Sequence, residues 1–357
     1  MVIGNYQLPI TNYQLPTTMN IFITGGAGFI GCNCADTFLG QGHQVTLYDN
    51  LSRVGGPANL AWLHEQHGGR FRFVKGDVRD YDALCQAIQG AEVVLHLAAQ
   101  VAVTTSMVNP REDFAINALG TFNVLEAVRH HCPQAVVLYA STNKVYGGME
   151  EVRVVEQATR YAYVDYAAGI PESYPLDFHS PYGCSKGTGD QYTIDYARIY
   201  GLKSLVFRQS CVYGPRQFGV EDQGWVAHFV IAAVQNRLIN IYGDGKQVRD
   251  LLHVHDLMRA YQLGIERIEQ VKGQAFNLGG GPQNTLSIWA EFRPLLEPLA
   301  GRPIPVRYAD WRPGDQRVFI ANVSKAATLL GWRPTISPAE GIRELYEWVS
   351  ANPELFQ

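Results

Sequence analysis

The chain has 357 residues, of which 46% are hydrophobic and 17% charged, and its formal net charge at pH 7 is −4. This length predicts one large domain or two interlocked ones. Because the charge is small and Lys and Arg are not clustered, we expect neither nucleic acid nor a membrane surface as a partner. No apolar run reaches the roughly 18 residues of a membrane span. The six cysteines contain no CxxC pair, so we expect reduced thiols and a cytoplasmic protein.

The N-terminus consists of two near copies of one segment. Asn5-Tyr-Gln-Leu-Pro-Ile-Thr11 returns as Asn12-Tyr-Gln-Leu-Pro-Thr-Thr18, and Met19 follows directly. A secretory signal needs a basic start and a continuous apolar core, and this segment has neither. We interpret residues 1–18 as a translated repeat, disordered or extended, that precedes the functional start at Met19.

From residue 20 onward, short apolar segments alternate with helical stretches. Strands are expected at 21–24, 44–48, 71–74, 92–97, 135–139 and 203–207, and helices from 28 to about 40, at 114–131 and at 180–200. This alternation predicts an α/β fold with a Rossmann-type, doubly wound parallel sheet covered on both faces. After Gly214 the chain is richer in Gly and Pro. We therefore expect a sheet domain at 19–212 and a smaller α/β substrate-binding lobe, mainly 213–357, with segments exchanged between the two.

A glycine triad directly follows the first expected strand and opens the first helix. Gly25, Gly28 and Gly31 would form a tight turn whose bare backbone lets a pyrophosphate approach the helix N-terminus. Asp49 ends the second strand, where it would bind the ribose hydroxyls of a dinucleotide and repel a 2′-phosphate. The pattern therefore predicts NAD in preference to NADP, against the simpler interpretation of a structural turn.

The expected NAD site gathers residues from several strand ends. Asp77 and Val78 follow the third strand, where they would meet the adenine, although Asp77 as a helix cap is an equal alternative. Ala98, Ala99 and Gln100 follow the fourth strand, where a dinucleotide crosses the sheet. The complete expected set is Gly25, Gly28, Phe29, Ile30, Gly31, Asp49, Asn50, Ser52, Arg53, Asp77, Val78, Leu97, Ala98, Ala99, Gln100, Asn117, Tyr182 and Lys186.

Ser180-Pro-Tyr-Gly-Cys-Ser-Lys186 carries the main catalytic pattern. Ser180 suits an N-cap and Pro181 the first helical position, so Tyr182 and Lys186 would lie one turn apart on one helix face. A cation beside a phenol favours the phenolate, which can then act as a base. A surface tyrosine with a solvated lysine is the alternative. Thr142, at the end of the fifth strand, could hydrogen-bond both a sugar hydroxyl and Tyr182.

These motifs together resemble the extended short-chain dehydrogenase/reductases that modify nucleotide sugars. The resemblance extends from Met19 to Trp348 and includes Val212-Tyr-Gly-Pro-Arg216. Within that superfamily, Ser141-Thr-Asn-Lys-Val-Tyr-Gly147 and Leu176-Asp-Phe-His-Ser-Pro-Tyr-Gly-Cys-Ser-Lys186 are similar to the 2-epimerases that convert CDP-paratose to CDP-tyvelose. The resemblance implies inversion at C2 of a CDP-linked deoxy sugar through a transient keto-sugar, with hydride return from tightly held NAD.

The resemblance also implies the roles of the catalytic residues. Tyr182 would remove and return the hydroxyl proton, Lys186 would hold the nicotinamide ribose and lower the pKa of Tyr182, and Thr142 would orient the hydroxyl. Related dehydratases carry a glutamate where this chain has Lys144. The cation at that position favours redox inversion over elimination, unless it points to solvent.

Substrate contacts are expected mainly from the second half of the chain. Arg249 and Arg312 resemble the family's phosphate-binding arginines, and Arg is suited to this by its bidentate fork. Salt-bridge roles are the alternative for both. Further expected substrate residues are Thr104, Thr105, Asn143, Arg216 and Gln217, although the two threonines could instead cap a helix. In the resembling family, helices like those at 114–131 and 192–200 often form a four-helix interface, which implies a homodimer or homotetramer.

No metal site is expected. His253 and His255 suggest a zinc pair only superficially, since no third ligand accompanies them, and His96 fits a satisfied core residue better than a catalyst. His179 could touch the site, and Trp225 could stack a cytosine, but packing explains both equally well. Two other functions stay open: a UDP-sugar 4-epimerase on the same scaffold, and a nucleotide-binding protein without catalysis.

Overall fold

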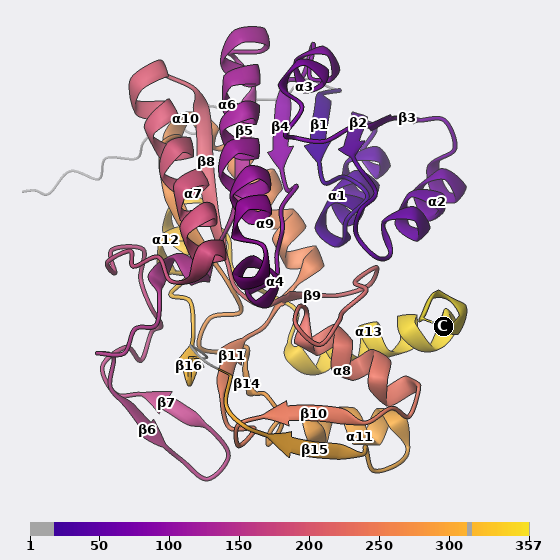
Figure 1. The fold of residues 1–357 in the computed structure, drawn as a ribbon, viewed down its shortest axis with the longest axis vertical. Coiled ribbons are helices and arrows are strands. Elements are labelled where there is room, and N and C mark those ends of the chain that lie inside the picture. The colour runs from indigo at the N-terminus through magenta and orange to yellow at the C-terminus, as the bar shows by residue number, and fades with distance from the viewer. Residues whose placement is uncertain (1–17, 313–315, 357) are drawn as a thin grey trace, which may run out of the picture.

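The computed structural model describes residues 18–312 and 316–356 (Figure 1). The expectation for residues 1–17 lies outside this range. The centre of the fold is a seven-stranded sheet in which every pairing is parallel. In spatial order its strands are β13 (Ala275–Leu278), β8 (Lys203–Gln209), β5 (Val136–Thr142), β4 (Val93–His96), β1 (Asn20–Thr24), β2 (Gln44–Asp49) and β3 (Phe71–Lys75). The chain leaves β3 at one edge and resumes with β4 beside β1, so the predicted doubly wound Rossmann fold is confirmed.

Two apolar layers cover the two faces of this sheet. Successive strand residues point to opposite faces, so Ile21 and Ile23 pack in one layer while Phe22 packs in the other. The first layer contains the helices α1 (Phe29–Gly40), α2 (Gly56–His67), α9 (Val254–Glu266), α10 (Ile268–Val271) and α12 (Ser324–Leu329). The second layer contains α3 (Tyr81–Ala87), α6 (Gly120–His131) and α7 (Ser180–Tyr200).

The second lobe lies beyond the carboxyl ends of the strands and has its own core (Figure 1). Its helices are α8 (Trp225–Val234), α11 (Arg293–Ala300) and α13 (Pro338–Ala351). Its strands pair as β10 (Ile239–Tyr242) with β15 (Val306–Ala309), and as β14 (Thr285–Ser287), β11 (Val248–Asp250) and β16 (Val318–Phe319) in one small sheet.

The sheet domain and the lobe exchange segments, so each contains residues from both sides of residue 212. The strand pair β9 (Val212–Tyr213) and β12 (Leu252–His253) leads the chain back to α9 and β13 in the large sheet. In the other direction, the hairpin β6 (Val154–Glu156) and β7 (Tyr161–Tyr163) reaches the lobe, where Tyr161 N donates to Lys246 O over 3.0 Å. The remaining elements are α4 (Val103–Val108), α5 (Pro110–Phe114), η1 (Ala115–Leu119), η2 (Asn143–Tyr146) and η3 (Pro353–Phe356).

The helix predicted at 114–131 is interrupted. Residues Ala115–Leu119 form a π-helix between α5 and α6. A π-turn inserts one extra residue, so it rotates the side chains before it relative to those after it. The side chain of Asn117 within this turn is consequently buried.

The catalytic helix α7 begins at Ser180, one residue earlier than the N-cap assignment of Ser180 predicted. The Ser180 hydroxyl nevertheless accepts from Gly183 N over 3.2 Å, which is the bond an N-cap makes. Ser180 has φ 63°, a left-handed conformation that is uncommon for a residue with a side chain. This strained start places Tyr182 on the inner face of the helix.

A buried ion pair fixes α7 to the sheet. Asp190 on α7 receives two hydrogen bonds from the guanidinium of Arg208 on β8, each 2.9 Å long, and a third of 2.7 Å from Ser141 Oγ on β5. Asp190 is fully buried and Arg208 is only 4% exposed. Because a lone buried charge is very costly, removing either partner strongly disfavours the folded state.

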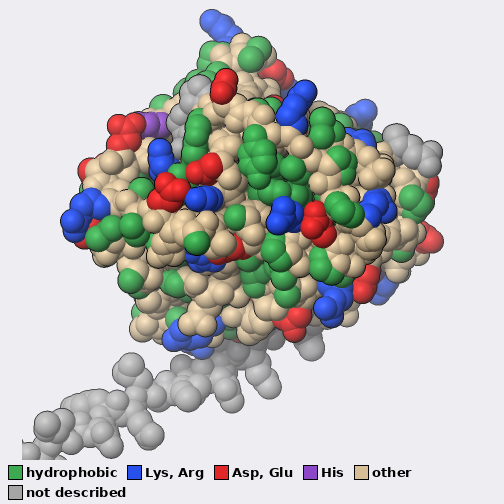
Figure 2. Space-filling model, turned by 90° about the horizontal axis from the view of Figure 1, so that it is seen from below, with side chains coloured by type: hydrophobic (Ala, Val, Ile, Leu, Met, Phe, Trp, Pro, Cys, Tyr) green, Lys and Arg blue, Asp and Glu red, His purple; other side chains and the backbone are tan. Residues whose placement is uncertain are grey.

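The face of the molecule drawn in Figure 2 shows no strong charge bias. On the face drawn in Figure 2, basic and acidic side chains are interspersed with apolar ones. Among the described residues, the helices are all too short or too polar to cross a bilayer.

Candidate active site

The glycine turn has the tight geometry that a pyrophosphate-binding loop needs. Gly25 has φ 68°, and a Cβ there would stand 2.8 Å from Ala98 N. A Cβ at Gly31 would stand 2.2 Å from Gly25 O. Any side chain at either position would therefore push the turn away from the N-terminus of α1, whose free N–H groups favour an anion. The turn fits a dinucleotide.

A first cleft runs from this turn across the carboxyl ends of β1, β2 and β4. Most of the residues expected to bind NAD line it together: Gly25, Gly28, Phe29, Ile30, Gly31, Asp49, Asn50, Ser52, Arg53, Asp77, Val78, Leu97, Ala98 and Ala99. Asp49 accepts from Ala27 N over 3.0 Å and from Leu51 N over 2.7 Å, and burial raises the pKa of its carboxyl. The carboxylate is thus held at the end of β2 by the backbone of the glycine turn.

Asp77 is also held, but by side chains. Asn50 Nδ2 donates to it over 2.9 Å, and the Arg79 guanidinium makes two further bonds. These hydrogen bonds lower the pKa of Asp77 to about 2. It stands at the rim of the cleft and does not cap a helix, since Asp80 caps α3.

A second cavity adjoins the first. It contains Thr142, Asn143, Lys144, Tyr182 and Lys186. It shares Phe29, Ile30, Leu97, Ala99, Val101, Gln217 and Gln223 with the first cleft. The predicted catalytic residues therefore meet at the inner end of the dinucleotide cleft, where a reacting substrate would stand beside the cofactor.

Burial dominates the electrostatics of the catalytic pair. Tyr182 is 8% exposed, and burial raises its pKa to about 12, while a hydrogen bond with Thr142 acts in the opposite direction. Lys186 is 4% exposed, and burial lowers its pKa to about 7 against the raising effect of Asp190 and Asp113. Without ligands, burial therefore favours the neutral form of both groups.

The expected lowering of the Tyr182 pKa by Lys186 does not occur in this arrangement. The Lys186 ammonium donates instead to Ala140 O over 2.5 Å and stands 4.3 Å from the centre of the Tyr139 ring. Its charge is thus directed at the end of β5 rather than at the phenol. The Thr142 hydroxyl is the group that favours the phenolate.

Two expected cofactor residues lie behind the catalytic helix and do not line the first cleft. Asn117 Nδ2 donates to Ser185 Oγ over 3.1 Å and to Gln100 O over 3.0 Å, while Asn117 Oδ1 accepts from Gln100 N. Asp113, which sequence reasoning missed, receives Ser185 Oγ–H over 2.5 Å and Gln100 Nε2–H over 2.8 Å. Gln100 and Asn117 therefore position α7 from behind. The π-turn that buries Asn117 could not be read from the apolar pattern.

The expected substrate residues are divided between several places. Asn143 lines the second cavity, and Gln217 lines both cavities, whereas Arg216 lies only on the first, with its guanidinium 4.1 Å from the Trp62 ring. Thr104 and Thr105 are in α4 and line neither cavity. Their neighbour Ser106 makes the useful contact, accepting from Tyr182 N over 3.1 Å.

The two expected phosphate-binding arginines belong to the lobe and line neither cavity. Arg249 is 8% exposed on β11, and its Nη1 donates to Val248 O over 2.8 Å. Arg312 forms an ion pair of 3.2 Å with Asp222 and lies 3.9 Å from the Tyr242 ring centre. Because Asp222 lines the second cavity, Arg312 stands directly behind its wall.

The isolated histidines His96 and His179 are each paired with neighbouring protein groups. His96 is buried between the hydroxyls of Thr24 and Thr121, at 2.7 and 3.0 Å, and burial lowers its pKa to about 3. It is thus a satisfied core residue, as its apolar strand predicted. His179 is exposed and pairs with Asp177 over 2.8 Å. Trp225 lines the second cavity while packing edge-on against Phe292.

The fold and the site together define an enzyme fold of the short-chain dehydrogenase/reductase type. The defining features are the doubly wound sheet, the glycine turn with an acidic residue ending β2, and the buried Tyr-x-x-x-Lys pair beside a threonine. Sequence comparison agrees. The chain belongs to the family described as GDP-mannose 4,6 dehydratase, whose model matches residues 22–345.

Relatives within and around this family include epimerases. The CDP-paratose 2-epimerase of Salmonella typhi is 45% identical over 340 residues, which cover 93% of this chain and 100% of that protein. The UDP-glucose 4-epimerase of Thermotoga maritima, solved with UDP-glucose, superposes with a TM-score of 0.80 at 31% identity, covering 94% and 100% of the two chains. The UDP-glucuronic acid 4-epimerase of Bacillus cereus, solved with UDP-glucuronic acid and NAD, gives a TM-score of 0.80 at 27% identity, with 93% and 99% covered.

The first prediction concerns the Thr142–Tyr182 hydrogen bond. A bond to the phenolate lowers the pKa of Tyr182, so Thr142→Val should raise that pKa and reduce the phenolate fraction at any given pH. The rising limb of a kcat/KM profile against pH should then move to higher pH, while Thr142→Ser keeps the wild-type profile.

Tyr182→Phe should lower kcat by about 10²–10⁴-fold with NAD binding intact. A Tyr182→Phe enzyme with near-normal turnover would exclude Tyr182 as the base.

The second prediction concerns cofactor choice. Asp49→Ala removes a charge that repels a 2′-phosphate, so the affinity for NADP relative to NAD should rise by about tenfold or more, equivalent to ~1.4 kcal/mol. Dissociation constants of both cofactors, measured by fluorescence titration, provide the ratio. Asp77→Asn is the matched control, since it neutralises a carboxylate of the same cleft but should leave the ratio unchanged. Equal ratios in wild type and Asp49→Ala would rule out this role.

Proposed function

We propose that this protein binds NAD in the first cleft and inverts C2 of CDP-paratose to give CDP-tyvelose in the second cavity. The observation that carries the proposal is 45% identity to a CDP-paratose 2-epimerase over the whole of that protein. Thr142, Tyr182 and Lys186 are all present and meet in one cavity. A binding protein without catalysis would have no need of this set.

The chain's own residues account for the proton and for the position of the sugar. Bound NAD supplies a hydride acceptor that later acts as the donor. Tyr182 takes the proton of the sugar hydroxyl and returns it, and Thr142 holds the phenol and the hydroxyl in line. Lys186, released from Ala140 O, holds the nicotinamide ribose; its positive charge then favours the phenolate of Tyr182.

The second cavity is poor in acidic groups, and this favours inversion over elimination. Elimination of water needs a general acid or base near the sugar. Among the described residues that line this cavity, Asp222 is the single carboxylate, and it pairs with Arg312. Lys144 stands next to the catalytic strand end, with its ammonium 3.5 Å from Gln316 Oε1. A cation at this place suits a redox inversion in which no leaving group departs.

The nucleotide end of the substrate would be held by the lobe. Arg312 already pairs with the cavity wall, and its exchange of Asp222 for a diphosphate would convert one ion pair into another. Arg249 would bind from β11, and Asn143 and Gln217 would contact the sugar end. A UDP-sugar 4-epimerase is the alternative function, because solved relatives of similar fold carry that name.

The third prediction tests reaction and substrate together. CDP-paratose labelled with deuterium at C2 should give CDP-tyvelose that keeps the label, because hydride removal and return do not exchange with water. NMR of the sugar resonances measures both the inversion and the label. Loss of deuterium to solvent would indicate proton abstraction at carbon. Turnover of UDP-glucose but not of CDP-paratose would support the alternative, and no turnover of either would leave a binding protein.

We further propose that two copies associate through α6 and α7. Large apolar side chains are exposed on these two helices, namely Phe122, Tyr192, Ile199 and Tyr200, and Phe114 and Leu119 are exposed just before α6. Phe122 and Tyr192 already pack edge to face across the two helices, with ring centres 5.8 Å apart. Exposed apolar groups gathered on neighbouring helices are typical of an interface.

The fourth prediction tests this association. Ile199→Glu places a charge in the proposed interface, so it should convert the protein to monomers in light scattering coupled to size exclusion. Leu238→Glu is the matched control, because Leu238 is similarly exposed, at 51% against 61%, but lies outside the two helices. A monomeric wild type, or an Ile199→Glu variant with unchanged mass, would contradict the proposal.

A further inference from the structure

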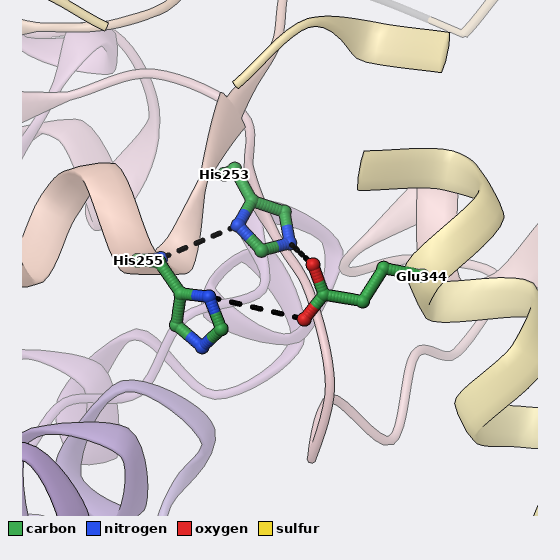
Figure 3. A group of neighbouring side chains, drawn as sticks. All are labelled: His253, His255 and Glu344. Atoms are coloured by element: carbon green, nitrogen blue, oxygen red, sulfur yellow. Dashed lines mark hydrogen bonds and ion pairs between the residues drawn. The ribbon is translucent and has the colours of Figure 1, made fainter. Parts of the chain in front are cut away.

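Two histidines and a glutamate from distant parts of the chain point toward one another outside both cavities (Figure 3). His253 ends β12 and precedes α9, and His255 follows in the first turn of α9. Glu344 comes from α13, almost ninety residues later in the sequence. None of the three lines the first cleft or the second cavity. The third ligand that the sequence did not offer is thus supplied by the fold.

The distances within this group are short for three separate side chains. His253 Nε2 stands 3.5 Å from one oxygen of Glu344, and His255 Nδ1 stands 3.8 Å from the other. The three ligand atoms all lie within 4.8 Å of one another. Ligand atoms of a tetrahedral zinc ion, with bonds of about 2.0–2.2 Å, stand about 3.3–3.5 Å apart. A shift of roughly 1 Å would therefore close the group around a metal.

The deepest member of the group has an unused polar atom. His253 is 0% exposed, and its Nε2 is among the buried side-chain atoms that have no hydrogen-bond partner. The other two members have room to adjust, because the side chains of His255 and Glu344 are 53% and 42% exposed. A fixed inner ligand with two adjustable outer ones is an arrangement that a cation can complete.

The packing of α13 brings Glu344 to the histidines. A Cβ at Gly341 would stand 2.2 Å from Tyr213 Oη and 2.8 Å from His253 Cδ2, so only glycine lets the helix come this close. Gly341 and Glu344 are three residues apart and share a helix face. Tyr213 Oη is a second buried atom without a hydrogen bond beside the same ring. The close approach therefore directs the carboxylate onto the imidazoles.

We propose that His253, His255 and Glu344 bind a divalent transition metal of the zinc type, with water completing the coordination. Two imidazoles and one carboxylate are a ligand set that zinc accepts. Metal on Nε2 requires the proton of His253 to move to Nδ1, which currently accepts from His255 N over 3.4 Å. That bond is longer than a good hydrogen bond, so giving it up costs little.

The proposed metal would join two parts of the fold. It would tie α13, which packs against α8 in the lobe core, to the start of α9 beneath the sheet. The inference is independent of the proposed epimerase activity, because the site lies away from both cavities.

Zinc binding to the full chain, without an affinity tag and after treatment with a chelator, tests this site. Titration calorimetry should show one equivalent that is lost, or weakened at least tenfold, in His255→Ala and in Glu344→Gln. His131→Ala is the matched control, since His131 is an exposed histidine on α6, and it should bind as wild type. Saturating zinc should also raise the thermal midpoint of the wild type by a few degrees but not that of the two ligand variants.

A rescue separates ligation from simple packing. His255→Cys replaces one zinc ligand by another, so it should restore the equivalent that His255→Ala loses. Cobalt in place of zinc should give the visible absorption of a four-coordinate site in the wild type and in His255→Cys. The proposal is overturned if wild type binds no zinc, or if His255→Ala and Glu344→Gln bind the same number of equivalents with the same affinity, which would place the binding elsewhere in the chain.

Discussion

The pair formed by Asp190 and Arg208 is the constraint on which the active site depends. Asp190 lies one turn beyond Lys186 on α7, and its second partner, Ser141, directly precedes Thr142 on β5. One carboxylate therefore locks the helix that carries the acid–base pair to the strand end that carries the hydroxyl. Arg208 extends the network, since its Nη1 donates to Tyr146 Oη over 3.1 Å at the end of η2.

This network explains how charged and polar side chains can be buried next to the site. Each charge is paired and each donor has an acceptor, so the desolvation cost is offset by short bonds in a medium of low dielectric. The same burial makes the ligand-free catalytic pair inactive as a base. Lys186 is engaged with Ala140 O, and Tyr182 is a neutral phenol with a pKa of about 12. On the proposed function, a bound cofactor would offer Lys186 a new partner in place of Ala140 O, and its charge would then favour the phenolate of Tyr182.

The parts of the site that the sequence predicted well are those with a local cause. The glycine turn needs only a strand, three glycines and a helix, and the Tyr182–Lys186 spacing needs only one helical turn. The doubly wound parallel sheet followed from the alternating elements, because such a sheet is the common way to bury them, but its edge strand β13 was not among the expected strands. Asp49 was found because the end of a strand next to the turn is fixed by that topology.

The parts that were missed depend on tertiary packing. Asn117 lies within a π-turn, which a pattern of apolar residues does not reveal, and it holds the backbone of Gln100 by two hydrogen bonds. Asp113 became important through its contacts with Gln100 and Ser185. Glu344 meets the two histidines because Gly341 lets α13 come close to Tyr213 and His253. A glycine within a helical segment does not by itself indicate which residues it will contact.

The shared wall of the two cavities connects the choice of substrate to the binding of the cofactor. The loop after β9 carries Gln217 and Gln223, and Gln223 Oε1 accepts from Arg53 Nη2 over 2.8 Å across the first cleft. A loop from the lobe thus reaches across the first cleft while it also lines the second cavity. On the proposed function, the sugar ring must present either face to one fixed hydride position. Firm contacts are therefore best placed on the nucleotide and diphosphate, which Arg249 and Arg312 are proposed to bind, so that the sugar ring keeps the freedom to turn.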